Sequence, residues 1–174
     1  MKKRASMPAA LLGLCLAQAL SACTSPASSS PPIHRIKSSN PQSPILVGAL
    51  VPPGASLFYL SGQVPDQVDT TKPKDDPKSY GDTKTQTLSV LTKIKAALEE
   101  QKLSLSDVIK LTVYLVGDPE KGGKMDFKGF SEAYAQQFGT QAQPNIVART
   151  TVQVAALANP AFLVEIEATA AKAP

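Results

Sequence analysis

Two stretches near the C-terminal end of the chain, residues 147–155 and 162–170, alternate between two kinds of side chain. Successive side chains of a strand point to opposite sides, so each stretch is expected to form a strand with one apolar and one polar face. The segment 157–161 that joins them contains Asn159 and Pro160, which together are a turn signal. We therefore predict an antiparallel hairpin.

The polar faces of these two strands carry one cation and two carboxylates. With the turn centred near Ala158, Thr151 would face Glu165 and Arg149 would face Glu167. One explanation is a cross-strand ion pair on a solvated face. The other is a site, because a guanidinium grips a carboxylate with two hydrogen bonds. A carboxylate that is partly removed from water can also orient and deprotonate a water molecule.

The residues between about 44 and 146 supply the other elements of one α+β domain. The patterns predict strands at 45–51, 56–62 and 109–115 and helices at 82–102 and 127–138, with a polar loop at 64–81. Two helices can cover one face of the resulting mixed sheet. The other face is expected to carry polar side chains, namely Tyr114, Arg149, Thr151, Gln153 and Glu165.

Four motifs in this order resemble the Rid family of reactive-intermediate deaminases, also called YjgF-type or endoribonuclease L-PSP proteins. They are SGQVPD at 61–66, SDVIKLTVYL at 106–115, ARTTVQVAAL at 148–157 and VEIEATAA at 164–171. The resemblance covers residues from about 45 to 171. It implies a YjgF/chorismate-mutase-like fold, a homotrimer with clefts between subunits, and chemistry that needs no metal or organic cofactor.

The resemblance also implies roles for particular residues. Arg149 would bind the carboxylate of a 2-imino or 2-amino-enoic acid, and Glu165 would position the water that releases ammonia and leaves a 2-keto acid. Thr151 would contribute its backbone carbonyl, and Gly62 would line the cleft. The family's ligand-binding Asn is replaced by Ser131, and residues 45–51 lack the family's Tyr. A non-catalytic trimer that binds small carboxylates or keto acids is the alternative function.

The first residues look like a bacterial lipoprotein signal. A basic start is followed by an apolar run at 7–20, too short to span a bilayer, and by Leu20, Ser21, Ala22 and Cys23. We expect residues 1–22 to be removed and Cys23 to carry lipid; an ordinary secretory signal is the alternative. Residues 23–43 would then be a lipidated, Ser/Pro-rich disordered tether, and 44–174 the Rid-like domain. This predicts a bacterial cell-envelope protein that faces the periplasm, on the outer membrane where a cell has two.

Removal of the signal changes the charge of the chain and the chemistry open to it. The whole chain has 18 basic and 14 acidic residues, and residues 1–22 contain three of the basic ones, which leaves 15 against 14. A protein so close to neutral is not expected to bind nucleic acid, and this disfavours the ribonuclease activity reported for some relatives. Cys23 becomes the one cysteine of the mature chain, so it has no intramolecular disulfide. The single histidine, His34, falls in the expected tether, so a Ser-His-Asp triad or a metal site lacks its usual residues.

Overall fold

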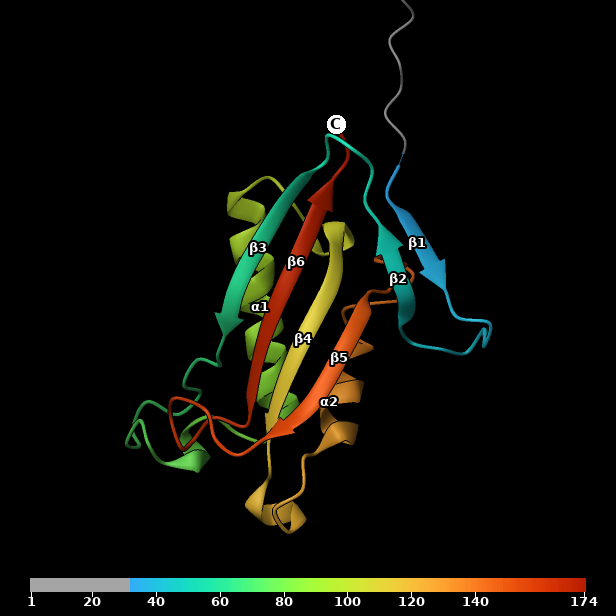
Figure 1. Ribbon diagram of the computed structural model, residues 1–174. Helices are drawn as coiled ribbons and strands as arrows, with labels where there is room; N and C mark the ends of the chain where they lie inside the picture. Colours follow the sequence, from blue (N-terminus) through green and yellow to red (C-terminus); the bar gives the residue numbers. More distant parts are fainter. Residues whose placement is uncertain (1–31) are drawn as a thin grey trace, which may run out of the picture.

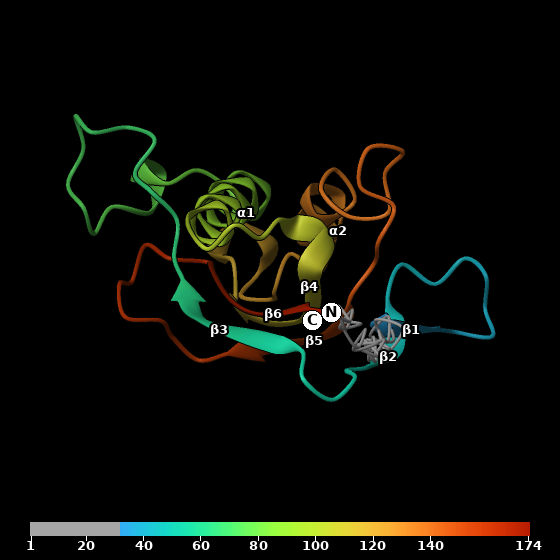
Figure 2. The same ribbon diagram turned by 90° about the horizontal axis from the view of Figure 1, so that it is seen from above.

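The computed structural model describes residues 32–174, so the predicted signal, Cys23 and the first part of the expected tether lie outside the described residues. Two α-helices cover one face of a six-stranded mixed sheet, and the other face is open (Figures 1 and 2). The predicted α+β class, with both helices on one face, is confirmed. The elements are β1 (His34–Lys37), β2 (Leu46–Leu50), β3 (Ser56–Gln63), α1 (Thr83–Glu100), β4 (Val108–Val116), α2 (Phe127–Tyr134), β5 (Ala148–Val154) and β6 (Val164–Lys172). Short 3-10 turns lie at Pro77–Ser79, Leu105–Asp107 and Pro119–Lys121.

The order of strands across the sheet is β1-β2-β5-β4-β6-β3, so the predicted hairpin of β5 and β6 is wrong. Strand β4 lies between them, parallel to β5 and antiparallel to β6. A parallel neighbour needs a crossover, and α2 provides it between β4 and β5. Residues 155–163 are therefore a connection that passes the end of β4, not a tight turn.

The hydrophobic core lies between the helices and this central strand. Leu111, Val113 and Leu115 of β4 are all 0% exposed and point toward the helices. They pack with the apolar stripe of α1, including Ile94 and Leu98. Asp82 caps the start of α1, since its side chain accepts a hydrogen bond from the Thr85 N–H at 2.8 Å. Within residues 32–174 no helix is long and apolar enough to cross a membrane.

Part of the expected tether belongs to the folded domain. Residues 34–37 form β1, an antiparallel partner of β2, so the prediction of disorder is wrong there. Arg35 holds this strand in place by donating hydrogen bonds to the carbonyls of Ser106, at 2.6 Å, and Val108, at 2.9 Å. The hairpin of β1 and β2 is joined to the rest of the sheet at one register position, Leu46 with Ala148.

The loop 64–81 is ordered by contacts with the connection 155–163. Tyr80, 5% exposed, meets the edge of the Phe162 ring with centroids 5.0 Å apart. The Asn159 side chain donates a hydrogen bond to the Lys74 carbonyl at 2.8 Å. The two loops thus lie together at the end of the sheet where β3 ends and β6 begins (Figure 1).

Candidate functional site

Arg149 extends from β5 toward the helices. Its register partner on the parallel strand β4 is Leu111, which is 0% exposed beneath the helical layer. The guanidinium carbon of Arg149 lies 4.5 Å from the centroid of the Tyr134 ring, 4.9 Å from that of Phe130 and 5.8 Å from that of Phe127. These three residues follow one another along one face of α2. The cation is thus held against aromatic faces, which attract it through their quadrupoles.

The guanidinium has no anionic partner among residues 32–174. No carboxylate there forms an ion pair with Arg149, and its Nη1 atom is buried without a hydrogen-bond partner. Burial lowers the pKa of Arg149 from its ordinary value, while the nearby Tyr134 opposes this shift. An arginine still stays protonated near neutral pH. A desolvated cation without a counter-ion is a site prepared for an anion.

Two more predicted site residues lie on this side of the sheet. Thr151 is two positions along β5 from Arg149, so it shares its face, and its buried Oγ1 also lacks a hydrogen-bond partner. Ser131 is half-buried on α2, four residues after Phe127 and three before Tyr134, which places it on the same helical face. We call this group the arginine half-site; it comprises Arg149, Thr151, Ser131 and the rings of Phe127, Phe130 and Tyr134.

Glu165 lies on the opposite, open face of the sheet. Its register partner on β4 is Tyr114, which is out of phase with the buried Leu111, Val113 and Leu115. The Glu165 side chain packs over Gly62 of β3 and fills the space that a Cβ atom at this glycine would need. Gly62 therefore allows the carboxylate to lie against the edge strand.

Tyr114 of β4 is the register partner of Glu165 and a hydrogen-bond partner of Glu167. Its hydroxyl donates a hydrogen bond to Oε2 of Glu167 at 3.2 Å. Desolvation, this hydrogen bond and the negative charges of Glu167 and Glu165 raise the pKa of Tyr114 above its ordinary value. At neutral pH the phenol is protonated, as in an ordinary tyrosine, and donates this hydrogen bond. We call Gly62, Tyr114, Glu165 and Glu167 the glutamate half-site.

The structure thus separates side chains that the sequence placed on one face. Arg149, Thr151 and Gln153 are in register with the buried residues of β4, whereas Glu165 is in register with Tyr114. The predicted shared face depended on direct pairing of β5 with β6, which the insertion of β4 prevents. Gln153 instead fixes the loop that follows β4, since its amide donates to the Gly123 carbonyl and accepts from the Met125 N–H.

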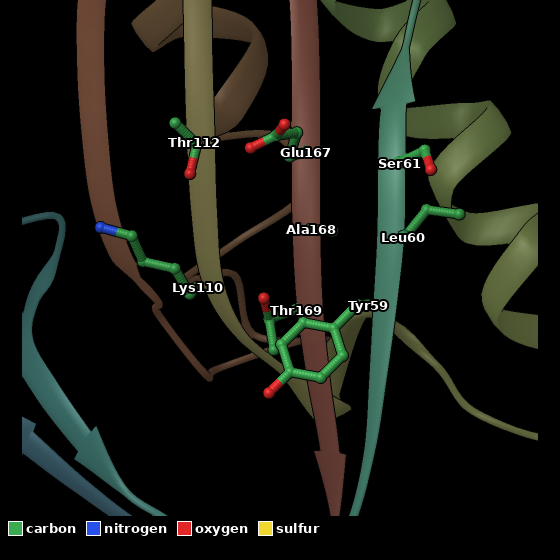
Figure 3. A pocket seen from close by; sticks show the side chains of 8 residues that line it. All are labelled: Tyr59, Leu60, Ser61, Lys110, Thr112, Glu167, Ala168 and Thr169. Atoms are coloured by element: carbon green, nitrogen blue, oxygen red, sulfur yellow. The ribbon is translucent and has the colours of Figure 1, made fainter.

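A shallow hollow of about 280 Å³ lies on the open face beside the glutamate half-site (Figure 3). Lys110 lines it from β4, Glu167 from β6 and Tyr59 from β3. Lys110 donates a hydrogen bond to the Thr150 hydroxyl at 2.7 Å. Arg149 does not line this hollow, so the hollow alone does not unite the two half-sites.

Sequence reasoning selected Arg149 and Glu165 as candidate site residues but did not predict what surrounds them. The spacing of Phe130, Tyr134 and Phe138 indicated a core-facing helix, and these three side chains do belong to the core. Phe130 and Tyr134 also hold the cation, together with the exposed Phe127. Tyr114 was expected on the polar face, but nothing in the pattern predicted its hydrogen bond to Glu167. Among residues 32–174 no group of His, Cys, Asp and Glu side chains has the arrangement needed to bind a metal ion.

Comparison with known proteins identifies the fold and the family. The sequence profile of the endoribonuclease L-PSP family matches residues 48–172. The chain belongs to this family. The match confirms the resemblance drawn from the four motifs, because the same family is known under the names Rid and YjgF.

Relatives in the family extend over most of the domain. A RutC family protein of Pyrococcus horikoshii is 40% identical over 117 residues, which are 67% of this chain and 80% of that protein. One from Saccharolobus solfataricus is 34% identical over 116 residues, 67% of this chain and 79% of that protein. The crystal structure of Escherichia coli TdcF with bound serine is 31% identical with a TM-score of 0.53, and the match covers 70% of this chain and 84% of TdcF. The Rid protein YyfB of Yersinia pestis, of unknown function, shares the fold at 23% identity and a TM-score of 0.60, over 80% of this chain and 98% of that one.

Substituting Gly62 tests how the glutamate half-site is built. In Gly62→Ala the new methyl group takes the space of the Glu165 carboxylate, so this side chain should rotate away from β3. The free energy of unfolding should change by less than about 1 kcal/mol, because the end of a flexible side chain can move. Gly48→Ala is the matched control, since nothing lies within 4 Å of its Cβ position. Crystal structures of the two variants check this, and an unmoved Glu165 in Gly62→Ala would contradict it.

Proposed function

We propose that this protein hydrolyses 2-imino or 2-enamino acids to 2-keto acids and ammonia, at sites formed between the subunits of a homotrimer. The observation that carries the proposal is the arginine half-site, a half-buried cation that has no counter-ion among residues 32–174 and whose Nη1 atom is buried without a hydrogen-bond partner. The edge of a guanidinium offers two parallel N–H donors that match a carboxylate. Family membership adds a precedent, because TdcF was crystallised with serine, which also has a carboxylate on a carbon that bears nitrogen.

The two half-sites divide the work of the reaction. Arg149 binds the substrate carboxylate, and Ser131 and the backbone of Thr151 lie beside it. Glu165 accepts a proton from water as the water oxygen bonds to the imine carbon. Glu165 passes this proton to the nitrogen, which gives a carbinolamine. The hydroxyl proton then moves through Glu165 to the nitrogen as the carbon–nitrogen bond breaks, so ammonia leaves and a carbonyl remains. Gly62 provides the space in which the carboxylate lies.

The positions of the two half-sites are the reason for proposing an oligomer. Arg149 and Glu165 point to opposite faces of one sheet, and a small acid cannot reach both faces of one subunit. If the Arg149 of one subunit meets the Glu165 of its neighbour, the two functions come together. The open face also exposes Tyr59, 72% accessible, which a neighbouring copy would cover.

A trimer that binds small carboxylates or keto acids without turnover is the second candidate. It is favoured by the substitutions at two positions where the family's best-known deaminases contact ligand, Ser131 in place of Asn and no Tyr in residues 45–51. Both candidates use Arg149 in the same way. They differ in whether Glu165 activates water.

We also propose that the protein is a lipoprotein of the bacterial cell envelope, attached through Cys23. Support comes from the sequence around Leu20 to Cys23 and from the position of β1, which takes the chain into the domain at the edge of the sheet. Ten residues separate Cys23 from His34, so the extended chain reaches about 35 Å from the anchor.

Release of ammonia from enzymatically generated imino acids tests the reaction. Arg149→Ala should lower kcat/KM, because it removes a charge-assisted bidentate contact. The loss of transition-state stabilisation should be roughly 2 to 4 kcal/mol. Glu165→Gln should lower turnover on the order of a hundredfold while keto-acid binding persists. Glu167→Gln is the control and should cost less, since an amide oxygen can still accept from Tyr114. Binding that depends on Arg149 without ammonia release would establish the second candidate instead.

Mixed oligomers test whether sites are shared between subunits. Arg149→Ala and Glu165→Gln chains are each expected to have little activity, and trimers assembled from both at equal amounts should regain activity. Each shared site needs an intact Arg149 from one subunit and an intact Glu165 from the next, so about a quarter of sites are restored. The measurement is ammonia release after co-refolding. Activity no greater than that of the separate variants would show that both residues serve from one subunit.

Replacing Cys23 tests the anchor. Cys23→Ala should abolish incorporation of labelled fatty acid and move the protein from the membrane fraction to the soluble fraction, because multiple acyl chains are what make attachment stable. Ser21→Thr, which leaves the cysteine in place, serves as the comparison. Equal membrane recovery of Cys23→Ala and the parent chain would refute the anchor.

A further inference from the structure

The three rings that hold Arg149 differ in their exposure. Phe130 is 0% and Tyr134 is 2% exposed, whereas Phe127 is 44% exposed. Phe127 is the first residue of α2, and the cap at Asp126, which accepts from the Gly129 N–H at 3.0 Å, fixes its place. A single exposed ring is ordinary on a protein surface. This one lies beside the unpaired cation, with its centroid 5.8 Å from the guanidinium carbon.

The geometry of a guanidinium decides where the rest of a bound acid goes. Aromatic rings lie over the Arg149 guanidinium, so a carboxylate must approach along its edge, where the N–H donors point. The substituent on the next carbon of the ligand then runs beside the rings. Phe127 is the ring with surface left to contact it.

A second exposed apolar side chain flanks the same cation. Leu46 of β2 pairs with Ala148 of β5, so the following residues, Val47 and Arg149, leave the sheet on the same side. Val47 is 71% exposed. The space in front of Arg149 is thus bordered by apolar surface from α2 and from β2.

We propose that the acid bound at Arg149 carries a large apolar side chain, preferably an aromatic one, and that Phe127 determines this specificity. The inference rests on the proposed function of Arg149 as the residue that binds the substrate carboxylate. It narrows the substrate to 2-imino acids, and the product to 2-keto acids, whose side chains stack on the Phe127 ring and displace water from it. An acid whose side chain is only a methyl group would leave the Phe127 ring exposed to water.

Calorimetric titration with two keto acids, pyruvate and phenylpyruvate, tests the specificity without requiring turnover. Phenylpyruvate should bind the full domain, residues 32–174, roughly tenfold more tightly than pyruvate. Phe127→Ala should remove most of this difference by weakening phenylpyruvate, with pyruvate changed less than about twofold. Phe127→Tyr keeps a ring and should restore the preference. Val68→Ala, which shortens an exposed apolar side chain on the loop 64–81, is the control and should change neither affinity.

The outcomes separate this inference from the proposed reaction. Equal affinity of the parent chain for the two acids, or an equal loss of both in Phe127→Ala, would overturn the specificity. Ammonia release from 2-iminopropanoate and from 2-imino-3-phenylpropanoate is measured in parallel. Ammonia release without a preference between the two keto acids would support the proposed reaction and refute the specificity. A preference for phenylpyruvate without ammonia release would support the specificity and refute the reaction.

Discussion

Strand β4 is the constraint on which the rest of the structure depends. It has hydrogen-bonded neighbours on both sides, β5 in parallel and β6 antiparallel, and its buried side chains are the floor of the core. A central strand cannot leave its backbone groups unpaired, so both C-terminal strands are drawn to it. Because β4 lies between them, each residue of β5 or β6 lies on the same face of the sheet as its register partner on β4. Arg149 and Glu165 therefore lie on opposite faces.

The cation of the arginine half-site lowers the stability of the folded chain. Partial removal of a guanidinium from water without a counter-ion lowers the free energy of unfolding. The attraction of the cation to the aromatic faces offsets only part of this loss. Natural sequences keep such conflicts mainly where a ligand resolves them. The buried Oγ1 atom of Thr151, two residues away, has no hydrogen-bond partner either, which also favours a bound ligand at this place.

The sequence predicted most of the elements and the residue types of the candidate site, but not their arrangement. Alternation gives the faces of a strand, so residues 109–115 were placed correctly, yet alternation does not state which strand is its neighbour. The strand–helix–strand order through α2 did contain that information, since it favours parallel pairing of β4 and β5. Strand β1 was missed because His34–Lys37 is only four residues long and follows a Ser/Pro-rich stretch. Its order depends on Arg35 reaching carbonyls some seventy residues away, which no local pattern reveals.

The two hydrogen bonds of Arg35 to the carbonyls of Ser106 and Val108, here called the Arg35 clasp, also determine how the domain responds to force. Any tension on the chain before His34 reaches β1 first, and its antiparallel pairing with β2 and the two Arg35 hydrogen bonds resist it. Behind them, the β1–β2 hairpin is joined to β5 at one register position, whereas β5, β4, β6 and β3 are joined along their lengths. A pull strong enough to break the clasp would therefore detach the hairpin as a unit. The other four strands, which carry Arg149 and Glu165, would stay paired, mechanically isolated from the chain before His34.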